Sequence, residues 1–276
     1  MAVTFEKLKQ DATIFGLLEK ENLVWWQKCK NDPSLYIEIR KDNQVNIYFE
    51  GGSVARIHYC SKHKVLQVFT HYKYLGEDKS STTYVECVNR LEQEIDSILN
   101  RIKGKYSQKK AVDGKLSKEQ WSEKYIQGNL IVNNRDTHLD SEFAYIDDTQ
   151  NLDIRIDLVR CVDGVIQFVE LKRLDDGRML KSTDENPEII TQMNNYRTFI
   201  KRYSYDILDY YQKLYGVKVK LGLPVPTIAP QSVDVEPYLL IFDRWEKAHS
   251  KREKHKERME AILQKEHIKY AIINTL

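Results

Sequence analysis

The feature that most constrains the fold is the dipeptide Asp163-Gly164, which lies between two runs rich in Val, Ile and Leu. The runs read LDIRIDLVRCV before the dipeptide and VIQFVELKRL after it. Asp-Gly between two such runs is typical of a two-residue type I′ turn, which joins antiparallel strands and fixes their register. We therefore expect Val162 to lie opposite Val165, with the preceding and following residues paired in turn.

Continuing this register puts Asp157 opposite Glu170, five positions beyond the Val162–Val165 pair on each strand. Lys172 points to the same face as Glu170, because strand side chains alternate, and it lies opposite Arg155. Two opposed carboxylates repel each other, and burial increases that cost. A divalent cation removes the repulsion, since Mg²⁺ prefers carboxylate oxygens, and a nearby ammonium can orient a water. The hairpin therefore carries the groups needed for metal-assisted attack on a phosphodiester.

The order of elements around this hairpin predicts an α/β fold. Residues 118–276 are expected to form a helix from about Lys118, three strands, a long helix from Pro187 and a strand over YLLIFD. The first of the three strands covers EFAYID, and the hairpin supplies the other two. A charged helix and a last strand over KYAIIN extend this αβββαβ core, which we expect to have a central mixed sheet.

Within this order, Asp157 and the stretch Glu170–Lys172 resemble the signature of the PD-(D/E)xK nuclease superfamily, an acid on the second core strand and (D/E)-x-K on the third. The resemblance spans about residues 118–243 and implies a restriction-endonuclease-like core. It also implies that Asp157, Glu170 and the carbonyl of Leu171 bind Mg²⁺, for which Mn²⁺ can substitute. Lys172 would position or activate the attacking water, and the product would carry a 5′-phosphate.

The helix after the hairpin adds a second match. Gln192 and Tyr196 are spaced as in the QxxxY motif of RecB-like members, which implies that both support the site, although Tyr196 also fits the core stripe of the helix. The superfamily has a further acid on its first helix. Glu119 and Glu123 share one face there, and we favour Glu123 because Glu119 is nearer the expected helix start, where it would complement the dipole. Glu142, at the start of the first strand, stays a third possibility.

The first hundred residues follow a different pattern. Apolar spacing predicts a helix over residues 5–20 that ends before the Trp25-Trp26 pair. The runs LYIEIR, QVNIYFE, SVARIHY and VLQVFTHY alternate with turn residues, which predicts an antiparallel meander of four strands. A second helix is expected from Tyr84 to Ile102, capped by Ser and Thr at 80–82. We therefore predict a small α+β domain over residues 1–103.

Charge is unevenly distributed along the chain, although 43 Lys and Arg nearly balance 41 Asp and Glu. Residues 101–118 hold seven bases and one acid, so we place a basic linker at 104–117 and a nuclease-like domain at 118–276. Residues 133–188 hold fourteen acids and seven bases, whereas residues 247–258 hold six bases and two acids. An acidic region around a cation site with basic stretches beside it favours a nucleic-acid partner, with DNA preferred.

Several other classes of protein lack support in the sequence. Motifs for nucleotide binding, serine hydrolases and zincins are missing, and the four cysteines are too widely spaced for a disulfide scaffold or a zinc ribbon. The start MAVTFEKLKQ has no apolar leader core, and no run of residues is apolar enough to span a bilayer. We therefore expect a cytoplasmic protein without a membrane partner.

Alternatives to a metal-dependent nuclease stay open. The four charged side chains of the hairpin could face solvent and form surface ion pairs, or the chain could be an inactive nucleic-acid-binding protein on a nuclease-like fold. A protein-interaction module that forms a homo-oligomer through the tyrosine-lined helix is a third possibility. A zinc site is a less favoured prediction, and its ligands would come from His58, Cys60, His63 and His71.

Overall fold

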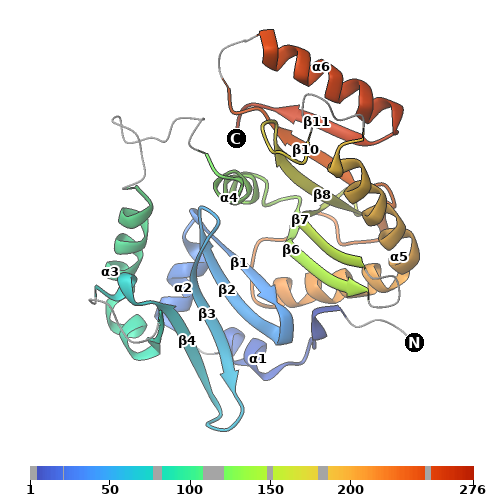
Figure 1. Cartoon of the computed structure of the whole chain (residues 1–276). Coiled ribbons are helices and arrows are strands. Elements are labelled where there is room, and N and C mark those ends of the chain that lie inside the picture. The colour runs from blue at the N-terminus through green and yellow to red at the C-terminus, as the bar shows by residue number, and fades with distance from the viewer. Residues whose placement is uncertain are drawn as a thin grey trace.

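The computed structural model of the chain describes residues 5–20, 22–76, 83–107, 121–147, 152–179, 186–245 and 250–276. It is a mixed α/β structure with two sheets, an antiparallel sheet of five strands and a mixed sheet of six. The two sheets lie side by side (Figure 1). Among the described helices, none is long and apolar enough to cross a membrane.

The first sheet confirms the predicted meander and adds a strand to it. Its strand order is β1-β2-β3-β4-β5, and all neighbours are antiparallel. The strands are β1 Leu35–Arg40, β2 Gln44–Phe49, β3 Gly52–Cys60, β4 Val65–His71 and β5 Tyr84–Glu86. Tyr84 was predicted to start a helix, but it extends the meander, because its backbone pairs with His71 and overrides the helical spacing of the side chains that follow.

The N-terminal helices also differ from the prediction. The single helix expected over residues 5–20 is a 3₁₀ turn followed by a short helix, and the Trp25-Trp26 pair lies inside a helix of its own. The turn Phe5–Lys7 contains Glu6 at a φ of 51°, which breaks the helical path. The helices before and after the meander are α1 Thr13–Lys20, α2 Val24–Asn31 and α3 Val88–Ser107, with 3₁₀ turns at Lys41–Asn43 and Tyr72–Leu75.

The second half of the chain has the expected order of elements. Its elements are α4 Glu123–Asn133, β6 His138–Asp147, β7 Leu152–Val162, β8 Val165–Arg173, α5 Glu188–Lys220, β9 Ser232–Val233, β10 Tyr238–Phe242, α6 Ser250–Lys265 and β11 Lys269–Ile273. The expected helix from Lys118 begins at Glu123 in the described residues, with the hydroxyl of Ser122 accepting from the Tyr125 N–H as its N-cap. The predicted linker at 104–117 falls partly in α3 and otherwise outside the described residues, so the two-domain division stays a prediction.

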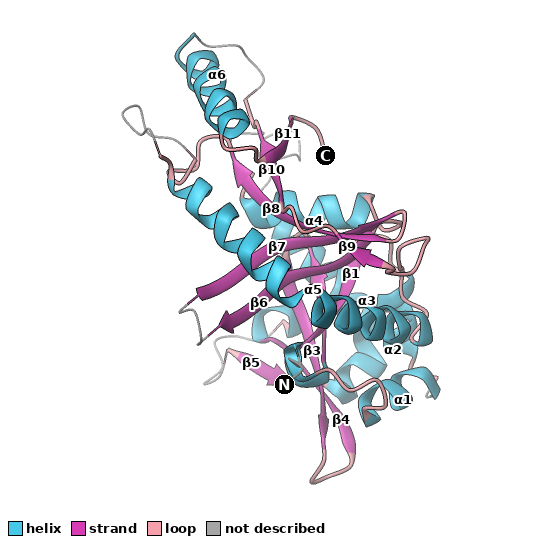
Figure 2. Cartoon of the chain, turned by 90° about the vertical axis from the view of Figure 1, so that its right-hand side faces the viewer, coloured by secondary structure: helices cyan, strands magenta, loops and turns pink. Residues whose placement is uncertain are grey.

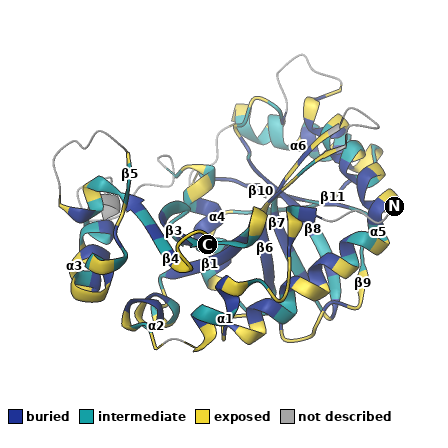
Figure 3. Cartoon of the chain, turned by 90° about the horizontal axis from the view of Figure 1, so that it is seen from below, coloured by how far each residue is buried: buried dark blue, intermediate teal, exposed yellow. Residues whose placement is uncertain are grey.

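The second sheet has the strand order β11-β10-β8-β7-β6, with β9 paired to β8 off this path. Strands β6, β7 and β8 are antiparallel, whereas β10 runs parallel to both β8 and β11. The parallel pairs arise because α5 and α6 each return the chain to the same end of the sheet. Figures 2 and 3 show α5 crossing the sheet and buried residues running through both sheets and their helices.

Helix α4 lies between the two sheets and contacts β1 and β3 on one side and β8 on the other. Two glycines allow this close approach. A Cβ on Gly51 would lie 2.0 Å from the carbonyl oxygen of Lys124, and one on Gly128 would lie 2.4 Å from the nitrogen of Gly51. Gly51 also has a φ of 77°, which favours glycine. The β2–β3 turn is therefore fitted against the first turns of α4.

A buried cluster of charged side chains from β1, β6 and α5 joins the two sheets. Lys218 Nζ donates to Glu38 Oε2 at 2.7 Å, and His138 Nε2 lies 2.6 Å from Glu38 Oε1. Beside them, Arg40 forms an ion pair with Asp140 at 3.2 Å. Glu38 lies on β1, His138 and Asp140 lie on β6, and Lys218 lies in the last turn of α5. Buried charges are costly unless they are paired, and these pairs link β1 of the first sheet to β6 and α5 of the second half.

Candidate functional site

The β7–β8 hairpin has the predicted register. Val162 pairs with Val165, and the pairing continues in step to Leu158 and Val169. Asp157 lies one position beyond that last pair, where its Oδ2 accepts a hydrogen bond from the backbone N–H of Leu171 at 2.8 Å. The turn therefore brings Asp157 to the segment that carries the ExK triplet.

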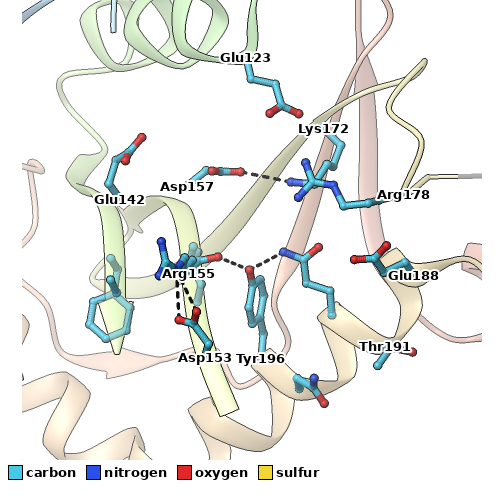
Figure 4. A pocket seen from close by; sticks show the side chains of 15 residues that line it. Glu123, Glu142, Asp153, Arg155, Asp157, Lys172, Arg178, Glu188, Thr191 and Tyr196 are labelled. Atoms are coloured by element: carbon cyan, nitrogen blue, oxygen red, sulfur yellow. Dashed lines mark hydrogen bonds and ion pairs between the residues drawn. The ribbon is translucent and has the colours of Figure 1, made fainter. Parts of the chain in front are cut away.

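A cavity of about 640 Å³ opens at this point of the sheet. Most of its lining comes from α4, β6, β7, β8 and the first turns of α5 (Figure 4). Five of the six residues predicted to be catalytic line it, namely Glu123, Asp157, Lys172, Gln192 and Tyr196. The sixth, Glu170, is buried directly behind them and contacts three of the five. The fold thus gathers residues from four separate elements into one cavity.

Lys172 and Glu170 form the buried centre of the site. Each is 2% exposed, so the solvent-facing alternative for this hairpin is wrong for these two residues. Lys172 Nζ donates to Glu170 Oε1 and, at 3.0 Å, to the carbonyl of Leu171, and it lies 3.7 Å from Asp157 Oδ2. By contrast, Arg155 is exposed and pairs with Asp153 at 3.1 Å. The ammonium of Lys172 is therefore held between the two acids at the wall of the cavity.

Gln192 and Tyr196 connect α5 to this centre. Gln192 Nε2 donates to Glu170 Oε1 at 2.7 Å and to the Tyr196 hydroxyl oxygen at 2.6 Å. The Tyr196 hydroxyl contacts the Arg155 carbonyl and lies 3.1 Å from Glu170 Oε2. Because Glu170 accepts bonds from Lys172 and from both α5 side chains, its carboxylate is fixed in one orientation. The QxxxY spacing is therefore explained by two side chains on one face of α5.

The acids of the cavity have unusual protonation equilibria. Burial, and then the charge of Glu170, raise the pKa of Asp157 to about 7. Burial also raises the pKa of Glu170 and that of Glu123. Among the described residues none hydrogen-bonds to Glu123 Oε1, although this atom is buried. Glu170 is buried and the other two acids are half-buried, and a cation would stabilise the charged form of carboxylates whose pKa values burial has raised.

The possible metal ligands are few. In the described ranges, no group of three or more His, Cys, Asp and Glu side chains is arranged to hold a metal ion. The donors that could hold a cation are the carboxylates of Asp157 and Glu170 and the carbonyl of Leu171, and Lys172 Nζ lies against all three. Mg²⁺ would suit so small a set, since it takes few protein oxygens and keeps several waters. The predicted zinc ligands do not form such a group either: the His58 ring contacts Phe69, and that of His71 contacts Tyr84.

Two residues at the cavity could supply the third acid of the site. Glu123 is the first residue of α4, and Glu142 lies on β6 with a φ of 56°, in the left-handed region. Both line the cavity, so the choice between them stays open. Glu119 lies outside the described residues. The expectation that Glu142 starts the first strand was wrong, because β6 begins at His138.

Arg178 is a cavity residue that the sequence analysis missed. It follows β8 and pairs with Asp176 through two hydrogen bonds of 3.0 Å, so its guanidinium is held at the cavity that Lys172 also lines (Figure 4). The hydrogen bond from the Ile189 N–H to the Arg178 carbonyl fastens this loop to the start of α5. An Asp-x-Arg pair in a charged loop is too common a pattern to have marked this residue.

Comparisons with known proteins do not identify the chain. No protein-family model matches it, and neither a curated protein nor a solved structure does. The functional interpretation therefore depends on the geometry of the cavity.

Proposed function

We propose that the protein is a Mg²⁺-dependent nuclease of the PD-(D/E)xK type, with a restriction-endonuclease-like core in its second half and DNA as the favoured substrate. The observation that carries the proposal is the buried Lys172, held against Glu170 and 3.7 Å from Asp157 at the wall of one cavity. Burying a lysine against an acid costs free energy, and such a pair at the wall of a cavity, beside acids with raised pKa values, is typical of a functional site.

The residues divide into three roles. Asp157, Glu170 and the Leu171 carbonyl would hold the cation, which when bound supplies Lewis-acid stabilisation of charge on a phosphate. Lys172 Nζ can donate a hydrogen bond to a water or a phosphate oxygen. Gln192 and Tyr196 hold the Glu170 carboxylate in place through bonds to both of its oxygens. Two hydrogen bonds from Lys172 Nζ go to Glu170 and to the Leu171 carbonyl, and its third N–H could reach a phosphate oxygen in place of the longer contact with Asp157.

The test is cleavage of linear and circular DNA by the full-length chain in Mg²⁺, Mn²⁺ or EDTA. We expect cleavage with either metal and none in EDTA, with losses of at least a hundredfold in Asp157→Asn and Lys172→Met. Asp163→Asn is the matched control, because it removes an exposed carboxylate at the turn of the same hairpin. Cleavage that persists in EDTA, or in both cavity variants, refutes the proposal.

A second function, nucleic-acid binding without cleavage, is favoured by one observation. Glu170 already accepts hydrogen bonds from Lys172, Gln192 and Tyr196, which leaves little of its carboxylate for a metal. Titration with Mn²⁺ followed by electron paramagnetic resonance separates the two functions. A nuclease should bind Mn²⁺ at a site that Asp157→Asn weakens, whereas an inactive protein should bind DNA with no such site.

A further inference from the structure

The β3–β4 hairpin is the part of the molecule that the cavity leaves unexplained. Between Glu50 and Glu77 the chain has no acid, whereas it has four Lys and Arg and three His. These residues form β3, β4 and the turn between them, and the final 3₁₀ turn that follows. In a chain with 41 acids, this segment has a net positive charge because it has no acid to balance its bases.

The turn of this hairpin is exposed and projects from the molecule. Every residue from Ser61 to Val65 is exposed, including Lys62 and Lys64, and Val65 is 47% exposed. Figures 1 and 2 show the turn at the lowest point of the structure, beyond the end of α1. The pairing of β3 with β2 ends at Ile57 and that of β4 with β5 begins at Phe69, so the end of the hairpin between these residues is a two-stranded basic arm with an exposed turn.

We propose that the β3–β4 hairpin is an arm that binds duplex DNA through Lys62 and Lys64 at its turn. A two-stranded ribbon fits a major groove, which is about 12 Å wide. Paired strands are about 4.8 Å apart, so the ribbon and its side chains fill such a groove. Lysines at the end of the ribbon can then reach phosphates on the edges of the groove.

The packing of the aromatic side chains favours a duplex over a single strand. Single strands are bound by exposed rings on which bases stack. On this hairpin Phe69 is packed edge-on against the ring of His58, and Tyr59 is packed against the hydrophobic core. On the neighbouring strand, the Tyr84 ring is covered by the guanidinium of Arg56 at 4.3 Å. These rings are occupied, whereas the two lysines at the turn are exposed.

The position of the arm suits a duplex that also reaches the cavity. Its root is the β2–β3 turn at Gly51, which contacts the first turn of α4, where Glu123 lines the cavity. The nine residues of β3 lie between root and tip, and the eight steps from the first to the last of them span about 26 Å at 3.3 Å per step. That length corresponds to about eight base pairs at 3.4 Å each. The arm would therefore contact DNA at a distance from the site of cleavage.

The proposal is tested by binding without cleavage, so that it does not depend on the metal site. The full-length chain is titrated in EDTA with a fluorescent duplex of 24 base pairs, the matching single strand, and polyglutamate as an acidic polypeptide. The variant Lys62→Gln/Lys64→Gln is compared with Lys201→Gln/Arg202→Gln, which removes the same charge from two exposed residues of α5. Thermal unfolding checks that both variants are folded.

We expect the arm variant to weaken duplex binding on the order of tenfold at 0.1 M salt and to make the slope of log affinity against log salt about two units shallower. The control should change the slope by less than half a unit. Equal effects of the two variants, a preference for the single strand, or an arm-dependent affinity for polyglutamate but not for DNA would each overturn the proposal. If the wild-type chain bound duplex DNA through the arm but cleaved no DNA in Mg²⁺, the proposed nuclease activity would be refuted and the arm proposal would stand.

Discussion

Replacing Lys218 with Met should destabilise the protein far more than an ordinary lysine substitution. Lys218 and Glu38 are 2% and 0% exposed, and the ammonium donates to Glu38 at 2.7 Å and to the Leu139 carbonyl at 2.6 Å. Burial by itself raises the pKa of Glu38, yet Lys218 and then His138 hold that pKa well below its usual range. Without Lys218, the Glu38 carboxylate loses the positive charge that offsets the free-energy cost of its burial.

The expected cost is about 3–5 kcal/mol, the range for removing one partner of a buried ion pair. The double variant Lys218→Met/Glu38→Gln should recover part of this loss, because it also removes the charge left without its partner. Lys213→Met is the matched control: Lys213 lies on the same helix and pairs with Asp209 four residues earlier, but it is exposed. That control should cost less than about 0.5 kcal/mol.

The assay is urea unfolding followed by tryptophan fluorescence and by circular dichroism. The fluorescence comes from four tryptophans: Trp25 and Trp26 are buried in α2, Trp121 packs against Phe242 of the second sheet, and Trp245 is exposed. The dichroism reports on the whole chain. Both signals should shift together in Lys218→Met, because the ion pair joins the two sheets. A cost below about 1 kcal/mol, or one equal to that of Lys213→Met, would show that the buried pair is not a net link between the halves.

Three further predictions concern stability and substrate binding. Burial, and then the charge of Glu38, raise the pKa of Asp140 to about 7, so the folded chain keeps a proton that the unfolded chain releases above about pH 4. The stability of the wild type relative to Asp140→Asn should therefore fall between about pH 4.5 and 7, by up to about 1.4 kcal/mol per pH unit in urea unfolding, and a flat or rising difference would contradict this. Phe5→Ala should cost about 3–5 kcal/mol, because the ring contacts five other aromatic rings, and a thermal scan without a clear shift would count against it. If Arg178 binds a substrate phosphate, Arg178→Gln should raise KM roughly tenfold with little change in kcat, whereas a fall in kcat alone would place its effect in the chemical step.

The parts of the structure that could be predicted depend on local chemistry. The Asp163-Gly164 turn sets the register of β7 and β8 by itself, so the approach of Asp157 to the ExK triplet followed from two residues. The spacing of Gln192 and Tyr196 places both on one face of α5 for the same reason, since helical geometry is local.

What could not be predicted depends on distant residues. The residues after Tyr84 have helical spacing, but the backbone of Tyr84 pairs with that of His71 on β4. This pairing with a residue earlier in the chain makes Tyr84 part of a strand. Glu38 and Lys218 are separated by 180 positions, and each looks like a surface charge in its own stretch of sequence. Arg178 reaches the cavity only because the loop that carries it is bonded to the start of α5. A pattern within one element contains none of this information.

The first sheet takes part in building the cavity. Arg40, on β1, donates to the carbonyl and the hydroxyl of Ser141 and pairs with Asp140, so it holds the β6 segment directly before Glu142. Glu142 has a φ of 56° and lines the cavity, and a residue in this conformation is kept there only by its surroundings. Residues 118–276 alone would lack Arg40 and Glu38, the carboxylate to which Lys218 donates. We therefore expect the function of this cavity to require the full-length chain, because the conformation of one wall depends on a strand that the nuclease signature does not include.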